Sequence, residues 1–286
     1  MNNFGLFLTG YKGLCFLQRI TSVPSFVVTY ENHEGSDSHT DIINYCAKNN
    51  ISLYDSKNFD YSTLETVDKV FAIGWQFLIK KNLEKFIVFH DSFLPEKKGF
   101  CPVVSSLLDR SEYLGVSCFS PVEERDSGEL IYRMKREISY PIKIKDAFDH
   151  IVDMFVDMFD NLLKNENLRS VCADNTVQSY SVWRDEEDLR IDWTNSSSAI
   201  KQFVYSLGYP YSGSSSLYDD DPIYIHDAEV MDDLNISNRK SHIGKTWCIE
   251  NGHPVVICGH GMLKITSAKN VHGDDVVFKK VRKRFK

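Results

Sequence analysis

Short apolar runs rich in β-branched and aromatic residues alternate with helix-sized stretches through the first half of this chain. Continuous apolar runs of four to six residues are typical of strands that are covered on both faces. Strands that alternate with helices predict βαβ crossovers, and hence an α/β domain with a mostly parallel sheet and helices on both faces. The predicted strands are Phe4 to Thr9, Phe26 to Tyr30, Val70 to Ile73, Phe86 to Phe89 and Gly115 to Phe119. The predicted helices are Leu14 to Arg19, Asp41 to Asn49, Val103 to Leu108 and Asp146 to Lys164.

The pattern changes near residue 180. Serine and aspartate clusters then separate short alternating segments, which predict strands that are buried on one face only. Lys245 to Glu250 and Pro254 to Cys258 flank an Asn251-Gly252 pair, which favours the two-residue turn of a β-hairpin. A third strand follows from Met262 to Thr266. We therefore expect two domains, an α/β domain over residues 1–180 and a small, mostly-β domain over residues 181–286.

Composition narrows the class of protein. The 286 residues carry a net charge of −7, and no apolar run approaches the roughly 20 residues of a membrane span. The first residues lack the basic and apolar stretches of a secretory signal, and the seven cysteines include no CxxC pair. These features predict a cytoplasmic protein with reduced thiols, no membrane contact and no nucleic-acid partner. One basic stretch, Lys279 to Lys286, is expected to be a solvated end. The alternative is that it binds phosphate or nucleic acid.

Candidate chemistry gathers around one strand end. The run Phe86 to Phe89 delivers His90 where open parallel sheets place ligands, and a loop with Pro95 and Lys98-Gly99 follows. Asp126-Ser127-Gly128 lies downstream as a turn. Asp91 follows His90 on an extended strand and so points the other way, which favours a turn role over a catalytic one.

In this order the motifs resemble those of the formyltransferases that use 10-formyltetrahydrofolate. That family has a strand ending in Asn-x-His, a Ser-Leu-Leu-Pro loop, an Arg-Gly pair before a proline, a Gly-Val-Thr strand and an Asp-Thr-Gly turn. The matching segments here are His90, Ser92-Phe93-Leu94-Pro95, Lys98-Gly99 with Pro102, Gly115-Val116-Ser117 and Asp126-Ser127-Gly128. The resemblance implies a Rossmann-like first domain and N10-formyltetrahydrofolate as the formyl donor.

Within the family, short acidic members with a Tyr-Pro-Tyr segment are similar to the sugar N-formyltransferases, whose acceptor is the amine of a nucleotide-linked amino sugar such as a dTDP-sugar. This likeness implies a role in polysaccharide biosynthesis. Methionyl-tRNA formyl transfer, by a related enzyme of the family, remains an alternative, as does hydrolysis of the donor. A homodimer is left open.

The resemblance also implies a role for each site residue. An amine that attacks a formyl carbon needs a base with a pKa near the working pH, which fits His90, and a carboxylate to hold that imidazole, which fits Asp126. The folate site would comprise Asp126 with four residues that follow one strand, Gly74, Trp75, Phe77 and Leu78. The expected substrate-binding residues are Tyr11, Lys12, Ser92, Lys97 and Lys98.

The sequence departs from the family at one position. Val88 stands where the family has its asparagine, two residues before His90, and valine cannot donate a hydrogen bond to an oxyanion. A degenerate member that binds folate or a sugar nucleotide without catalysis is therefore a further alternative. No metal site is expected, because the histidines of the second half lie singly, without ligand spacing: His226, His242, His253 and His260.

Overall fold

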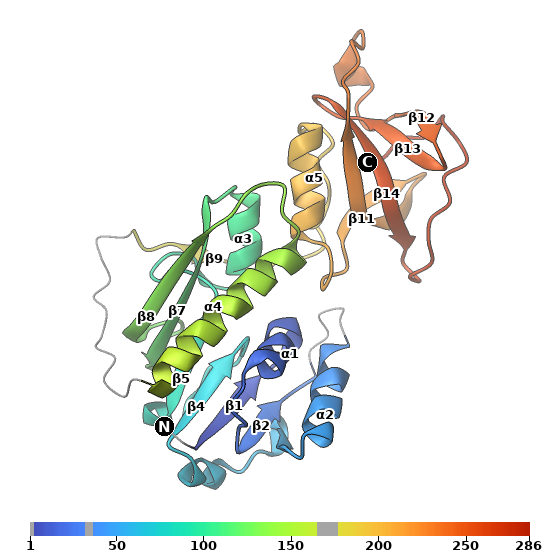
Figure 1. Cartoon of the computed structure of the whole chain (residues 1–286). Coiled ribbons are helices and arrows are strands. Elements are labelled where there is room, and N and C mark those ends of the chain that lie inside the picture. The colour runs from blue at the N-terminus through green and yellow to red at the C-terminus, as the bar shows by residue number, and fades with distance from the viewer. Residues whose placement is uncertain (1–2, 32–36, 165–176) are drawn as a thin grey trace. The chain divides into compact units, whose positions relative to one another are not determined.

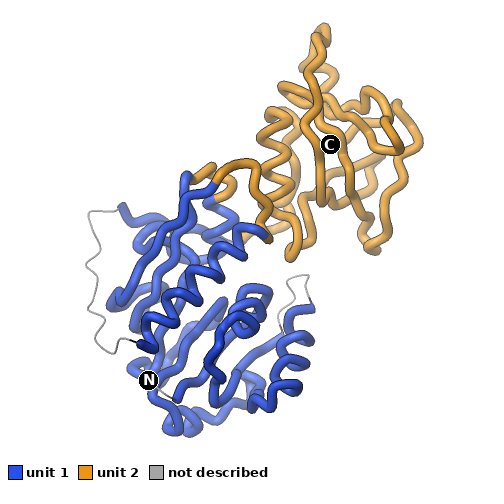
Figure 2. The backbone as a smooth tube through the Cα atoms, viewed as in Figure 1, with its two compact units in different colours: residues 1–106, 112–138, 146–183 blue, residues 107–111, 139–145, 184–286 orange. Residues whose placement is uncertain are grey.

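A computed structural model describes residues 3–31, 37–164 and 177–286 of the chain. These residues form two compact units (Figure 2). The N-terminal unit comprises Met1–Ser106, Glu112–Ile138 and Asp146–Trp183, and the C-terminal unit comprises Leu107–Ser111, Ser139–Lys145 and Arg184–Lys286. The C-terminal unit thus takes in two short segments from the first half of the chain, which a single boundary in the sequence does not describe.

The N-terminal unit is built on a seven-stranded sheet with the order β3-β2-β1-β4-β5-β7-β8 (Figure 1). The first five strands in this order are mutually parallel, β7 is antiparallel to β5, and β8 is antiparallel to β7. The strands are β1 (Phe4–Leu8), β2 (Phe26–Thr29), β3 (Ser52–Asp55), β4 (Lys69–Ile73), β5 (Phe86–His90), β7 (Tyr113–Pro121) and β8 (Gly128–Glu137). All five predicted strands are present, and β3 and β8 are additional.

Different elements cover the two faces of this sheet. On one face, Phe4 of β1 and Phe71 of β4 pack edge-on against Phe159 of α4 (Ile144–Lys164). Phe159 also contacts Phe16 of α1 (Gly10–Arg19). On the other face, Phe7 and Phe26 pack against Phe59 between two 3₁₀ helices, η1 (Ser56–Asn58) and η2 (Tyr61–Thr66). The remaining elements of this half of the chain are α2 (Ser38–Lys48), η3 (Leu83–Lys85), α3 (Pro102–Leu108) and the two-stranded pair β6 (Lys98–Gly99) with β9 (Tyr180–Ser181).

The C-terminal unit contains a five-stranded antiparallel sheet with the order β10-β11-β14-β13-β12. Its elements are α5 (Ser197–Ser206), β10 (Ser214–Tyr218), β11 (Asp221–Met231), η4 (Arg239–Ser241), β12 (Thr246–Glu250), β13 (His253–Ile257) and β14 (Met262–Asn270). The predicted hairpin is confirmed, because Asn251 and Gly252 both have positive φ angles, of 53° and 86°.

Helix α5 was not predicted, because its serine-rich start resembles a loop. Ser196 is in fact its N-cap, and the Ser196 hydroxyl accepts a hydrogen bond from the Ala199 amide at 3.2 Å. Within the same unit the buried side chain of Gln202 forms two hydrogen bonds with the backbone of Ile142. The Ile142 amide donates to Gln202 Oε1 at 3.0 Å, and Gln202 Nε2 donates to the Ile142 carbonyl at 2.9 Å.

The basic tail is exposed at most of its charged residues, as expected, but it is anchored to the C-terminal unit at Phe285. Phe285 is 2% exposed and packs against Trp193 and Tyr218 in the core of the C-terminal unit. Lys283 forms an ion pair with Asp219, and Lys286 forms one with Asp220 at 2.7 Å. The acidic cluster and the basic tail, which are separate features of the sequence, therefore pair with each other in the fold.

None of the helices in the described part of the chain is long and apolar enough to cross a membrane. The six cysteines that the structure describes are free thiols. The seventh, Cys172, lies outside the described residues.

Candidate active site

The parallel strands bring three turns to one edge of the sheet. Register pairs Leu8 of β1 with Ile73 of β4, and Ile73 with Phe89 of β5, so the carboxyl ends of these strands are level. The strand order reverses between β1 and β4, and open α/β sheets bind ligands at such a switch point. Tyr11 and Lys12 follow β1, Gly74 and Trp75 follow β4, and His90 ends β5. Most of the predicted site residues are therefore brought to one edge.

The first two turns touch through their backbones. Gly74 has a φ of 64°, and a Cβ at that position would lie 2.9 Å from the carbonyl oxygen of Thr9. The Thr9 amide also donates to the Ile73 carbonyl at 3.4 Å. Only glycine accommodates both the left-handed conformation and this close approach. Gly74 is thus required by packing, which places the turn after β4 beside the turn after β1.

His90 and Asp126 meet, as the sequence predicts. His90 Nδ1 lies 3.8 Å from Asp126 Oδ1, with the two side chains 8% and 16% exposed. On the other side of the ring, His90 Nε2 lies 3.3 Å from the Lys97 carbonyl oxygen. Each ring nitrogen therefore faces an oxygen atom that can accept a hydrogen bond from an N–H of the imidazole.

Sheet register alone does not bring Asp126 to His90. His90 pairs with Ser117, in the middle of β7, and the β7–β8 turn that carries Asp126 begins only after Pro121. The loop after β5 makes the link, because the Gly99 amide donates to Asp126 Oδ2 at 2.7 Å. Asp126 has a φ of 45°, a left-handed conformation that aspartate and asparagine tolerate better than most residues.

The loop from Ser92 to Phe100, called here the 92–100 loop, is held from the side of β7 and β8. Ser117 Oγ donates to the Ser92 carbonyl at 2.8 Å and accepts from the Leu94 amide at 2.9 Å. Two cations of β8 lie close to the Phe93 ring, with the Arg133 guanidinium 4.2 Å and the Lys135 ammonium 4.0 Å from the ring centroid.

Three predicted substrate-binding residues lie in this loop. Ser92 is 4% exposed, and its hydroxyl donates to the Glu96 carbonyl at 2.6 Å, so this group holds the loop together. Lys98 Nζ lies 3.0 Å from Ser127 Oγ, next to Asp126. Lys97 brings its carbonyl to His90. Contact of these residues with a substrate remains a prediction.

The residues predicted to bind folate follow β4. Phe77 is 57% exposed and Leu78 is 41% exposed, while Phe77 also packs against the Tyr30 ring at 4.5 Å. Trp75 is half-buried and contacts Phe7 and Tyr30. Exposed apolar side chains of this kind fit the flat ring of a pterin.

The sequence favours a turn role for Asp91, yet Asp91 forms an ion pair with Lys12 in the first turn of α1. The Lys12 ammonium also lies 5.0 Å from the centroid of the Phe148 ring of α4, which Tyr11 approaches at 6.3 Å. Burial acts to raise the pKa of the Asp91 carboxyl, but the Lys12 ammonium and the His90 imidazole outweigh burial and hold this pKa below its ordinary value. Strand alternation correctly turns Asp91 away from His90, but it does not reveal this partner.

This ion pair predicts a pH-dependent stability. A carboxyl whose folded-state pKa is depressed stabilises the fold above its ordinary pKa of about 3.9, and the contribution is lost as the pH falls through the lower folded-state pKa. We expect Asp91→Asn to lower the free energy of unfolding at pH 7 by about 2 kcal/mol, because a mostly buried ammonium loses its partner. The difference from wild type should shrink as the pH approaches 3, in urea denaturation followed by circular dichroism. Asp157→Asn, exposed on α4, is the control, and an equal loss there would contradict the assignment.

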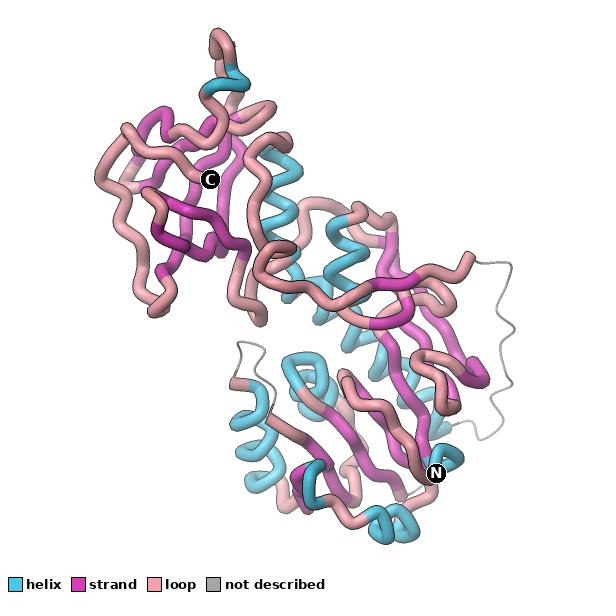
Figure 3. Tube along the Cα trace, turned by 180° about the vertical axis from the view of Figure 1, so that it is seen from behind, coloured by secondary structure: helices cyan, strands magenta, loops and turns pink. Residues whose placement is uncertain are grey.

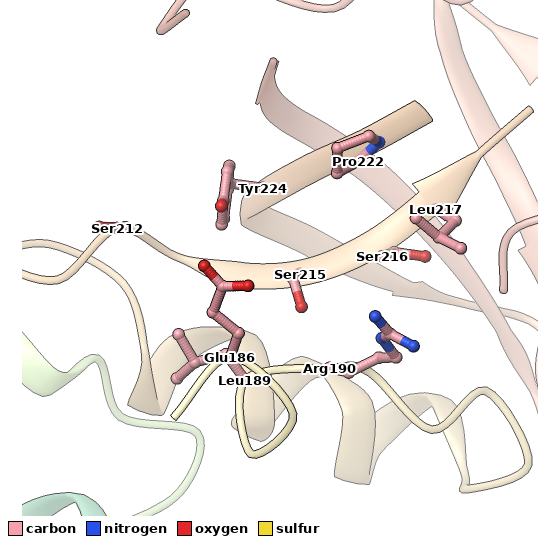
Figure 4. A pocket seen from close by; sticks show the side chains of 9 residues that line it. All are labelled: Glu186, Leu189, Arg190, Ser212, Ser215, Ser216, Leu217, Pro222 and Tyr224. Carbon is pink, nitrogen blue, oxygen red and sulfur yellow. The ribbon is translucent and has the colours of Figure 1, made fainter. Parts of the chain in front are cut away.

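The C-terminal unit has a pocket of about 290 Å³ that contains none of the predicted site residues (Figure 4). Its lining combines polar side chains with apolar ones and contains no histidine–carboxylate pair. The pocket is lined by Glu186, Leu189, Arg190, Ser212, Ser215, Ser216, Leu217, Pro222 and Tyr224.

Among the described residues, no group of three or more His, Cys, Asp or Glu side chains could hold a metal ion.

Comparison with known proteins adds to this geometry. Residues 184–281 match the family model of the formyl transferase C-terminal domain. Methionyl-tRNA formyltransferase of Fusobacterium nucleatum is 24% identical over 278 residues, which cover 87% of this chain and 88% of that protein. The same enzyme from Pseudothermotoga lettingae is 28% identical over 177 residues, which cover 58% of this chain and 57% of that protein.

Solved structures share the fold across both units. WlaRD, a sugar 3N-formyltransferase crystallised with dTDP and 5-N-formyl-THF, superposes with a TM-score of 0.66 at 15% identity and covers 93% of this chain and 97% of its own. The N-formyltransferase of Helicobacter canadensis, in complex with folinic acid and dTDP-3-aminofucose, gives a TM-score of 0.63 at 13% identity and covers 93% and 99%. The predicted α/β fold with a β-rich C-terminal part is confirmed. In sequence and in fold the chain is therefore similar to formyltransferases, with a match to the formyl transferase C-terminal domain over residues 184–281.

Proposed function

We propose that this protein transfers a formyl group from N10-formyltetrahydrofolate to the amine of a nucleotide-linked amino sugar. The observation that carries the proposal is the pairing of His90 with Asp126 beside the switch point of the sheet, in a chain whose residues 184–281 match the formyl transferase C-terminal domain. A base, its carboxylate and an exposed apolar surface stand on neighbouring turns, and acyl transfer to an amine needs this combination.

The turn after β4 supports folate as the donor. Phe77 and Leu78 expose apolar surface close in sequence to Gly74, at the same sheet edge as His90. Two of the structural neighbours are described as crystallised with a formylated folate. The formyl donor supplies the carbon that is transferred, and the side chains that follow β4 would hold its ring.

Charge supports a small acceptor over transfer RNA. The chain carries a net charge of −7, and two lysines of its basic tail are paired with Asp219 and Asp220 at the surface. RNA affinity depends on cations that are available to neutralise phosphates. Methionyl-tRNA formyl transfer remains the second candidate, because the relatives matched by sequence carry that name.

His90 is the residue through which the proton would move. The acceptor nitrogen forms a bond to the formyl carbon, and the bond from that carbon to N10 of the folate breaks. His90 takes the proton that the amine loses and gives it to N10, so the imidazole begins and ends neutral. While the proton is on the ring, Asp126 Oδ1 faces Nδ1 and the Lys97 carbonyl faces Nε2. The 3.8 Å separation from Asp126 is longer than a hydrogen bond, as catalytic contacts often are before substrate binds.

The test is a transfer assay with the purified chain. N10-formyltetrahydrofolate is mixed with a panel of dTDP-linked amino sugars, and formylated product is followed by mass. A mass gain of one formyl group on a sugar supports the proposal. Formylation of methionyl-tRNA alone would favour the second candidate, formate release without an acceptor would favour hydrolysis, and folate binding without turnover would favour a degenerate member.

A substitution at Val88 provides a second test of the proposed chemistry. Val88 and His90 are two residues apart on β5 and face the same side of the sheet, so an amide at position 88 would lie on the His90 side. We expect Val88→Asn to raise kcat about 10-fold to 10²-fold, because it adds a donor for the oxyanion. Val88→Ala, which removes bulk without adding a donor, is the control, and the interpretation fails if both variants behave alike.

A further inference from the structure

We propose that the segment 177–183 positions the 92–100 loop for catalysis through Ser179 and Ser181, and that it controls the rate of formyl transfer more than the binding of substrates. The inference rests on the proposed function, because it concerns the groups around His90. This segment leads from the N-terminal unit into the C-terminal unit and contains β9, a short strand that Figure 3 shows just after the second grey trace.

A dense set of hydrogen bonds joins the segment to the loop. The Ser179 amide donates to the Pro95 carbonyl at 3.2 Å, and the Ser179 carbonyl accepts from the Lys98 amide at 2.9 Å. The Ser179 hydroxyl accepts a hydrogen bond from the Lys97 amide, also at 2.9 Å. One further bond runs from the Phe100 amide to the Ser181 carbonyl at 3.0 Å. Four bonds within six loop residues leave this stretch little freedom to move.

The same loop residues carry the two contacts that define the site. Lys97, whose amide bonds Ser179 Oγ, presents its carbonyl to His90 Nε2 at 3.3 Å. Ser181 Oγ lies 3.4 Å from that same carbonyl. Gly99, which pairs with Ser181 in the β6–β9 ladder, donates its amide to Asp126. The segment therefore fixes the loop atoms that face both members of the His90–Asp126 pair.

Backbone strain shows that the loop needs such support. Lys97 has a φ of 50°, and a residue other than glycine held in this region costs on the order of 1 kcal/mol or more. Gly99 has a φ of 104°, and a Cβ there would collide with the carbonyl oxygen of Ser181. Without the segment, Lys97 would relax toward a common conformation and turn its carbonyl away from His90.

Burial shows that polar contacts hold the segment. Ser181 is 7% exposed, whereas its neighbours Tyr180 and Val182 are 66% and 67% exposed. The two serines, Ser179 and Ser181, are the most buried residues of the segment, so their polar contacts, and not an apolar core, hold the segment in place. A change of one hydroxyl should therefore loosen the loop without removing hydrophobic contacts.

The experiment compares Ser179→Ala with Ser179→Thr, which keeps the hydroxyl, and with Val182→Ala as the control in the same segment. We expect Ser179→Ala to lower kcat about 10-fold with KM for both substrates within about twofold, since a small misplacement of site atoms costs rate. Threonine at 179 should restore most of the rate, and Val182→Ala should behave as wild type. Gly99→Ala, which blocks the ladder, should lose about 10²-fold in kcat, the cost of a displacement near 1 Å.

Amide hydrogen exchange of the full chain gives a readout that does not depend on activity. Exchange at Lys97 to Phe100 should quicken in Ser179→Ala and stay unchanged in Val182→Ala. Wild-type kcat in both Ser179→Ala and Gly99→Ala, a loss confined to KM, or unchanged exchange in this loop would overturn the inference. A wild-type chain that transfers no formyl group would instead refute the proposed function, and the exchange data would still decide whether the segment holds the loop.

Discussion

Replacing His90 with alanine is expected to lower kcat for formyl transfer by about 10³-fold, within the range that a positioned base contributes. The reason is geometric, because His90 is the group at this edge of the sheet with an oxygen facing each ring nitrogen. A proton taken from the attacking amine can be held there and passed on. The measurement is kcat and KM with the acceptor that the transfer assay identifies.

Two comparisons make this result specific to the imidazole. His39→Ala removes a half-buried histidine of α2 in the same unit and should leave kcat unchanged. Added imidazole should recover part of the rate of His90→Ala, which a purely structural defect would not allow. A variant that turns over as fast as wild type would show that His90 is not the base.

Replacing Asp126 with asparagine is expected to lower kcat by about 10²-fold or more, as the loss of the carboxylate behind a catalytic histidine does elsewhere. Asparagine tolerates the left-handed backbone at this position, and its carbonyl oxygen can still accept the Gly99 amide. The change therefore removes the negative charge beside His90 and leaves the loop anchored. The effect should appear in kcat, with unchanged circular dichroism.

Asp126→Ala separates the two roles of this side chain. It removes the charge and also the acceptor for the Gly99 amide, so we expect a larger loss than in Asp126→Asn and faster amide exchange at Gly99. Glu124→Gln, exposed in the same turn, is the control for a simple change of net charge. Equal rates in the asparagine variant and wild type would remove Asp126 from the mechanism.

The central strands could be predicted because both of their faces are buried. β1, β4 and β5 form continuous apolar runs, and their observed ends lie within one residue of the predicted ends. β3 and β8 lie at the two edges of the sheet, and most of their residues are partly or fully exposed, so their sequences lack that signal.

The site could be predicted only as far as its motifs reach. His90 and Asp126 were found through their order in the chain, and they do come together. The link to Lys12 could not be found, because 79 residues separate it from Asp91 and neither residue type is distinctive alone. The docking of Ser179 and Ser181 on the 92–100 loop is a two-residue pairing between distant segments, which leaves no periodic pattern in the sequence.

The interleaving of the two units has a consequence for the order in which the protein is synthesised. Residues 107–111 and 139–145 leave the ribosome well before residues 184–286, with which they form one compact unit. The backbone of Ile142 cannot form its two hydrogen bonds with Gln202 until about 60 further residues have been added. A nascent chain stopped near residue 183 would therefore carry a sheet whose connections still lack their packing, and such intermediates tend to associate through exposed surface. Translation of the last third of the chain thus completes the folding of segments made in its first half.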